Sequence, residues 1–358
     1  MGKLWKENWE EAKKHFNGWW NHTGMVVTLH GKIERSAKPH AVFPDPGKAP
    51  SVKDMYINPE WIAKNRRFEL SSYNFIADNL PCASVNIGPG SLAIYLGSEP
   101  GFSESTVWYE PCISNPKKHP PLKFNPENKW WKRQLDIIKQ VQSLSEGNYF
   151  VGCPDIIENI DIISAMRDPQ TLMTDLIDRP DWVKEKVAEI NKAFFETYQI
   201  IYDLIKLEDG SSAFGPFEIW GPGKTVKVQC DASAMFSPKM FDEFVLPALT
   251  EQCKWLDHSM YHLDGTQAVC HLDSLLSIKE LDAIEWTPQA GLPNGGDKMW
   301  HDLYKKILKA GKSVQIVGIE KKDIYSLIDA IGAKGVYIKA YGIDTGKEAE
   351  EIIKKCGK

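Results

Sequence analysis

The segment Tyr261-His262-Leu263-Asp264-Gly265 has the residue types and the spacing that most directly predict chemistry. Residues two apart on a strand share a face, so we expect the side chains of His262 and Asp264 to point into the same space. An imidazole and a carboxylate placed in this way can bind a divalent metal, although Asp is a less frequent zinc ligand than Cys. They can also act as a general base and its orienting acceptor. The structural alternative is a buried His–Asp hydrogen bond that fixes a loop.

A metal site needs further ligands, and Glu285 follows Asp264 by 21 residues at the end of the next predicted strand. We therefore predict His262, Asp264 and Glu285 as metal ligands. Asp231 follows the apolar run 226–230, and we predict it as a catalytic residue together with His262 and Asp264. Cys230 precedes Asp231 and must face the opposite way on the strand, so it is predicted to be a small core residue.

Other polar and aromatic residues also stand where predicted strands end, and these are expected to bind the substrate. They are Asn86, Glu218, Trp220, Tyr261, Trp286, Gln289, Lys339 and Tyr341. The chain contains 13 Trp, and aromatic side chains around a pocket suit a flat ligand or a quaternary ammonium. An Asp or Asn after a strand also commonly caps the next helix, which is the structural alternative for such positions.

The elements that would position these residues alternate between short β-branched runs and helical patterns. Eight candidate strands are at 83–87, 148–153, 211–220, 226–230, 258–263, 282–286, 313–318 and 335–340. This alternation predicts an α/β fold with parallel strands and right-handed crossovers. Eight strands favour a (β/α)8 TIM barrel, with the site at the carboxyl ends of the strands, although a doubly wound sheet has much the same period. The runs 211–220 and 226–230 lie too close for an intervening helix, so one of them is a hairpin or an insertion.

We predict two regions: an aromatic-rich helical and loop extension over 1–80 that packs on the barrel, and the barrel itself over 81–358. The extension could cover the mouth of the barrel, form a homodimer interface or dock a partner. No GxGxxG or GxxxxGK[ST] motif predicts a nucleotide cofactor.

Charge and composition exclude several classes of protein. The 43 Lys and Arg against 48 Asp and Glu give a net charge of −5, so there is no basic excess to neutralise a nucleic-acid backbone and we expect no nucleic-acid partner. The chain shows neither a signal peptide nor an apolar run of membrane-spanning length. Its seven cysteines form no CxxC pair and no dense framework. We therefore expect a cytoplasmic protein with reduced thiols and no membrane contact.

The order of motifs resembles the uroporphyrinogen decarboxylase superfamily. The resemblance rests on VQCDASAMFSPKMFDEFVLPALTEQCKWLD, YHLDG, LDAIEWTP and GVYIKAYG, and it extends over residues 80–345. It implies a (β/α)8 barrel. The superfamily includes porphyrinogen decarboxylases and zinc-dependent methyltransferases that act on corrinoid proteins or thiols. The chain has only six Arg and places Asn86 where the decarboxylases have an Asp, so the resemblance is closer to the methyltransferases.

The thiol-activating methyltransferases hold zinc with a His-x-Cys motif and a second Cys later in the chain. This chain has His262-Leu263-Asp264 at the first position and Lys339-Ala340-Tyr341, without a Cys, in the region of the second. Such a site is compatible with zinc or with no metal. We predict a methyltransferase that moves a methyl group from a small methoxy or methylamine substrate to a corrinoid carried by a partner protein. The alternatives are a metal-free decarboxylase or lyase, in which Lys339 pairs with a substrate carboxylate, and a non-catalytic barrel that binds a small ligand.

Overall fold

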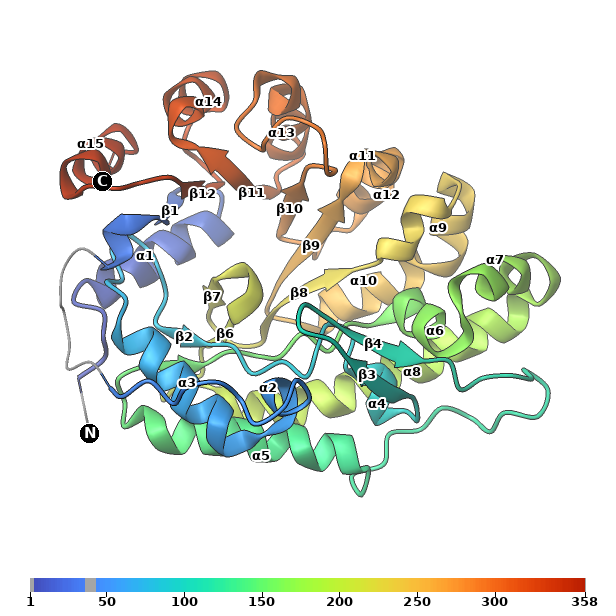
Figure 1. Ribbon diagram of the computed structural model, residues 1–358. Helices are drawn as coiled ribbons and strands as arrows, with labels where there is room; N and C mark the ends of the chain where they lie inside the picture. The colour runs from blue at the N-terminus through green and yellow to red at the C-terminus, as the bar shows by residue number, and fades with distance from the viewer. Residues whose placement is uncertain (1–2, 36–42, 358) are drawn as a thin grey trace.

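The computed structural model describes residues 3–35 and 43–357 (Figure 1). Its strands are β1 (Met25–Leu29), β2 (Cys82–Ala83), β3 (Glu99–Phe102), β4 (Val107–Glu110), β5 (Phe150–Val151), β6 (Ser212–Phe214), β7 (Ile219–Gly221), β8 (Thr225–Gln229), β9 (His258–Asp264), β10 (Ala283–Thr287), β11 (Ser313–Glu320) and β12 (Val336–Tyr341).

The main sheet has six parallel strands in the order β1-β12-β11-β10-β9-β8. All five residues of β1 and of β8 are buried, as expected for strands that are covered on both faces. The sheet curves, and helices α13 to α15 lie along its convex side (Figure 1). The predicted α/β class is confirmed.

The helices are α1 (Trp9–Trp20), α2 (Asp54–Ile57), α3 (Pro59–Ser71), α4 (Leu92–Tyr95), α5 (Lys129–Ser145), α6 (Asn159–Arg167), α7 (Pro169–Asp178), α8 (Pro180–Ile205), α9 (Pro238–Phe244), α10 (Leu246–Trp255), α11 (Gly265–Ala268), α12 (Leu272–Ser277), α13 (His301–Lys309), α14 (Ile324–Ile331) and α15 (Gly346–Lys355). Short polar side chains begin several of them. Asn128 accepts hydrogen bonds from the first turn of α5, and Thr345 forms a capping box on α15. None of the described helices is long and apolar enough to span a bilayer.

Two features differ from the predicted architecture. β1 comes from the segment assigned to the extension, yet it pairs with β12 from Met25–Val336 to Leu29–Ala340, because MVVTL is a fully buried apolar strand. The predicted extension therefore supplies a strand of the main sheet. The pair β2–β5 forms a separate two-stranded sheet, so the hydrogen-bonded ladders of the described residues do not form a continuous ring. Closure of the barrel stays a prediction.

Of the two closely spaced runs, one of which was predicted to be a hairpin or an insertion, 211–220 is the antiparallel hairpin β6–β7. It lies on the concave side of the sheet (Figure 1). Its backbone bonds to strands on opposite sides: the Cys153 amide donates to the Ala213 carbonyl at 2.7 Å, and the Gln315 side chain donates to the Phe217 carbonyl at 2.8 Å. The Tyr337 hydroxyl donates to the Glu218 carbonyl at 2.9 Å. The hairpin is therefore an internal insertion.

Aromatic residues of α1 cover the amino ends of the strands. The ring of Trp19 contacts Tyr337, and Trp20 stacks on His258 with 4.8 Å between ring centroids. The indole of Trp20 also donates to the carbonyl of Trp220 at 2.9 Å, which fixes the base of the β6–β7 hairpin. With the amino ends covered, the open side of the fold is at the carboxyl ends of the strands.

Candidate functional site

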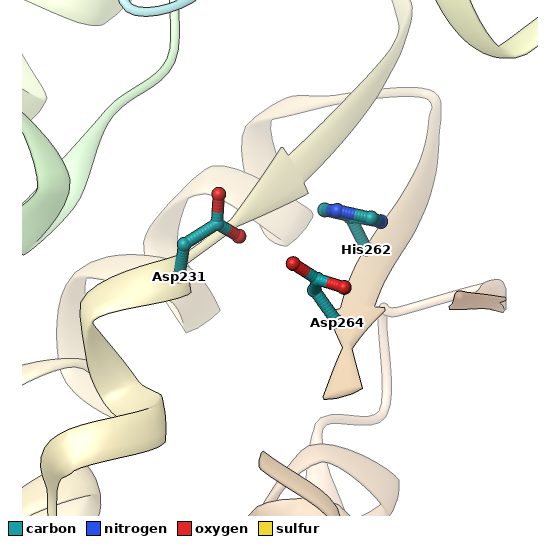
Figure 2. Close-up of side chains that lie close together, drawn as sticks. All are labelled: Asp231, His262 and Asp264. Carbon is teal, nitrogen blue, oxygen red and sulfur yellow. The ribbon is translucent and has the colours of Figure 1, made fainter. Parts of the chain in front are cut away.

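Three side chains that can bind metal meet at the carboxyl ends of β8 and β9. Asp231 begins the 3-10 turn Asp231–Met235 after β8, while His262 and Asp264 lie two residues apart on β9. One ligand atom from each of the three lies within 4.8 Å of the others. Figure 2 shows the three side chains pointing toward one another. Among the described residues, this group of Asp231, His262 and Asp264 is the candidate metal site.

Glu285, the third predicted ligand, is in contact with His262 and is not part of this group. Its Oε2 is hydrogen-bonded to Nδ1 of His262, and its Oε1 accepts a 2.7 Å hydrogen bond from Thr287. Burial alone lowers the pKa of His262, but the Glu285 carboxylate more than offsets this effect and raises the pKa above its ordinary value. With Nδ1 occupied by Glu285, Nε2 is the imidazole nitrogen that could bind a metal or a substrate.

Asp231 is held from two sides. Its Oδ2 accepts a 2.8 Å hydrogen bond from the Gln229 amide, and its backbone N–H donates to Asp161 at 2.8 Å. The carboxamide of Gln229 is oriented by Lys227, whose ammonium donates to its Oε1. Desolvation and the nearby Asp161 carboxylate raise the pKa of Asp231 to about 6.

Further acidic groups lie behind Gln229. Lys227 is almost fully buried and forms a 2.8 Å ion pair with Asp155. Glu158 accepts a 2.7 Å hydrogen bond from the backbone of Gln229, and burial raises the pKa of its carboxyl group to about 8. We did not predict roles for Lys227, Gln229 or Asp161 from the sequence. Period-two alternation back from Asp231 would have indicated the first two; Asp161 lies on α6, and no local pattern connects it to the site.

A cavity of about 500 Å³ adjoins Asp231. It is lined by Pro89, Val107, Trp108, Tyr109, Pro111, Asp161, Ser164, Ala165, Pro169, Asp231, Ala232 and Met235. Pro89 and Val107 also line a second cavity of about 630 Å³, which contains the predicted substrate-binding residue Asn86. The Asn86 side chain accepts a 2.8 Å hydrogen bond from the backbone of Asp155.

Three of the predicted substrate-binding residues form a cluster with His30, which the sequence analysis missed. The Glu218 carboxylate is 3.1 Å from Nε2 of His30 and 3.0 Å from the ammonium of Lys339. The ring of Tyr341 stacks on His30. Burial opposes ionisation of Glu218, but Lys339 and His30 lower its pKa to about 2. Burial likewise opposes charge on His30, but Glu218 and Glu34 raise its pKa to about 9. The charges of this cluster are already paired, and they anchor the tip of the β6–β7 hairpin.

The other predicted substrate-binding residues have different surroundings. Tyr261 and Trp286 are buried on the faces of β9 and β10 opposite to His262 and Glu285, because neighbouring residues on a strand point in opposite directions. Trp220 packs against Trp9 near the amino ends of the strands. Gln289 is exposed and accepts a 2.8 Å hydrogen bond from Thr266, just beyond Asp264. Of these four residues, Gln289 is the one that lies at the mouth.

Comparison with known proteins supports this fold. No family model matches the chain, and no curated protein matches it in sequence. Among solved structures, the chain is similar to a methyltransferase from Methanosarcina mazei, with a TM-score of 0.63 and 12% sequence identity. The alignment covers 97% of this chain and 98% of that chain. The chain therefore has a methyltransferase-like fold over nearly its whole length, and its predicted superfamily membership stays a prediction.

Proposed function

We propose that the protein is a methyltransferase that takes a methyl group from a small methoxy or methylamine substrate at Asp231, His262 and Asp264. The observation that carries this proposal is the convergence of three ligand atoms within 4.8 Å at the open ends of the strands. The similarity to a protein named a methyltransferase supports the same activity. The proposed acceptor is a reduced corrinoid carried by a partner protein.

The residues present suit a divalent metal such as zinc. Two carboxylates and one imidazole form an allowed zinc ligand set that leaves a position for substrate. Glu285 on Nδ1 of His262 and Gln229 on Asp231 are the kind of surrounding hydrogen bonds that orient metal ligands. When bound, the metal would act as a Lewis acid toward the oxygen or nitrogen that carries the methyl group.

The chain's own residues bind and orient the substrate beside this group. Glu285 fixes the His262 ring through its contact with Nδ1. If a proton is held at Nε2, the same geometry allows His262 to donate it to the leaving oxygen or nitrogen.

The structure gives less support to the lyase alternative. That hypothesis assigned Lys339 to a substrate carboxylate, but its ammonium lies 3.0 Å from Glu218 and is mostly buried. A lyase acting on a carboxylated substrate needs a cation that is free to bind it.

The test is methyl transfer to free cob(I)alamin, followed by the change in its absorbance, with a panel of methoxyarenes and methylamines. We expect transfer by the wild-type protein and loss of about 100-fold or more of the rate in Asp264→Asn, as is usual when a positioned catalytic group is removed. Gln199→Leu, in α8, where the side chain donates to the exposed Asp203, is the control and is expected to retain the rate. Absence of transfer from every donor by the zinc-loaded wild type contradicts the proposal.

A further inference from the structure

The cavity beside Asp231 has a wall that is mainly apolar and aromatic. β4 contributes Val107, Trp108 and Tyr109, and the turn after β8 contributes Met235. Trp108 and Met235 are unusually exposed for large apolar residues, at 47% and 56%. A cavity of about 500 Å³ is in the size range of small-molecule sites, which are mostly apolar with a few polar groups.

The charged residues that line this cavity are all acidic. Asp161 and Asp231 are the charged members of the lining among the described residues, and Asp264 lies close to Asp231. Within the described ranges 3–35 and 43–357, none of these three carboxylates forms an ion pair with a Lys, Arg or His side chain. The nearby lysines are already paired, Lys227 with Asp155 and Lys339 with Glu218.

Tyr109 adds a second aromatic ring to the wall of this cavity. Its hydroxyl is buried without a hydrogen-bond partner among the described residues. That hydroxyl lies beside Gly88, where an added Cβ would be 3.0 Å from it. The ring of Tyr109, like that of Trp108, is therefore the part that a ligand in this cavity can contact.

We propose that this cavity is the substrate subsite and that it selects a methylated compound carrying a positive charge and no acidic group. This inference rests on the proposed methyltransferase function and names the substrate class. The aromatic face of Trp108 and the carboxylate of Asp161 attract a cation. The lining of the cavity has no Lys, Arg or His side chain among the described residues, so a substrate carboxylate beside Asp161 would meet a like charge. The methyl-bearing end would lie toward Asp231.

The test uses three ligands that share a methoxyphenyl group and differ in charge: 4-methoxybenzylammonium, 4-methoxybenzyl alcohol and 4-methoxybenzoate. Binding is measured by calorimetry on the protein as purified and again after treatment with a chelator. We expect the ammonium to bind about tenfold more tightly than the alcohol, and the benzoate to bind more weakly than either. Added salt is expected to weaken binding of the ammonium and to leave that of the alcohol unchanged.

Trp108→Leu is expected to weaken binding of the ammonium, whereas Trp61→Leu, in the neighbouring cavity, leaves it unchanged. Equal or tighter binding of the benzoate, or no binding of any of the three ligands, overturns the inference. Binding requires no methyl transfer, so this result is independent of the transfer assay. Ammonium binding without transfer would contradict the proposed function and support the subsite. Transfer with a preference for the benzoate would support the proposed function and contradict the subsite.

Discussion

At the scale of single residues, the site depends on neighbours that hold His262 and Asp231 in place. Glu285 occupies Nδ1 of the imidazole, and the amide of Gln229 occupies Oδ2 of the carboxylate. Each neighbour is itself fixed, Glu285 by Thr287 and Gln229 by Lys227. Both functional side chains therefore keep one atom available for a metal or a substrate.

Replacing Gln229 tests this arrangement. In Gln229→Leu, Asp231 loses the hydrogen bond at Oδ2 and gains rotational freedom, so we expect zinc affinity to fall by about 10- to 100-fold. Isothermal titration calorimetry measures the change. Gln199→Leu replaces a Gln of α8 whose side chain donates to the exposed Asp203, and it should bind zinc as the wild type does. Unchanged affinity in Gln229→Leu would show that Gln229 does not position Asp231.

At the scale of elements, the β6–β7 hairpin lies on the concave side of the sheet and contacts both β9 and β12. The ring of Phe217 contacts that of His262, with 5.0 Å between centroids, while the adjacent Glu218 pairs with His30 and Lys339. Glu218 has a φ of 55°, which is uncommon for a residue other than Gly. The ion pairs therefore hold a strained turn against the site.

Removing this anchor should give a characteristic pH dependence. Glu218→Gln leaves Lys339 without its carboxylate, and we expect the free energy of unfolding to fall by about 3 kcal/mol. The pKa of His30 is raised from 6.5 to about 9, so its contribution to the free energy of unfolding is complete below pH 6.5 and is lost as pH rises toward 9. The pKa of Glu218 is lowered from 4.5 to about 2, so its contribution is lost as pH falls below 4.5.

Urea denaturation at several pH values measures this difference between wild type and Glu218→Gln. We expect the difference in free energy of unfolding to be largest between pH 4.5 and 6.5 and to become smaller at lower and at higher pH. A difference that is constant from pH 3 to pH 10 would refute the role of these ion pairs.

Close packing of β5 against the hairpin gives a second prediction at this scale. A Cβ added at Gly152 would lie 2.7 Å from the backbone nitrogen of Gly215 and 2.8 Å from Sγ of Cys82. Gly152→Ala must displace the hairpin, so we expect a loss of about 1–3 kcal/mol in thermal or urea unfolding. Gly346→Ala, where the added Cβ meets no atom within 4 Å, is the control and should not destabilise the protein.

Local patterns in the sequence were enough to predict some of this arrangement. Alternation along β9 predicted that His262 and Asp264 share one face of the strand, and in the structure their side chains lie close together. It also implied that Tyr261 faces away, although we had predicted that residue to bind the substrate. The role of Glu218 could not be read from local patterns, because it depends on a hairpin whose partners, such as His30, are almost 190 residues away. The pairing of β1 with β12 is a contact of the same long-range kind.

At the scale of the whole molecule, the covered amino ends and the internal hairpin leave one open side, where the Asp231, His262 and Asp264 side chains meet. The six-stranded sheet and the similarity to a methyltransferase fold are consistent with a site at the carboxyl ends of parallel strands. The acid-lined cavity opens beside Asp231 on this same side. The candidate metal site and this cavity therefore lie on the same side of the molecule.

The metal content of the purified protein tests the central claim most directly. Elemental analysis should be carried out on untagged wild type, on His262→Ala and on the control Gln199→Leu. We expect about one divalent ion per chain, mainly zinc, in the wild type and the control, and loss of that ion in His262→Ala. Absence of metal from all three proteins, or full retention in His262→Ala, would contradict a metal site at Asp231, His262 and Asp264.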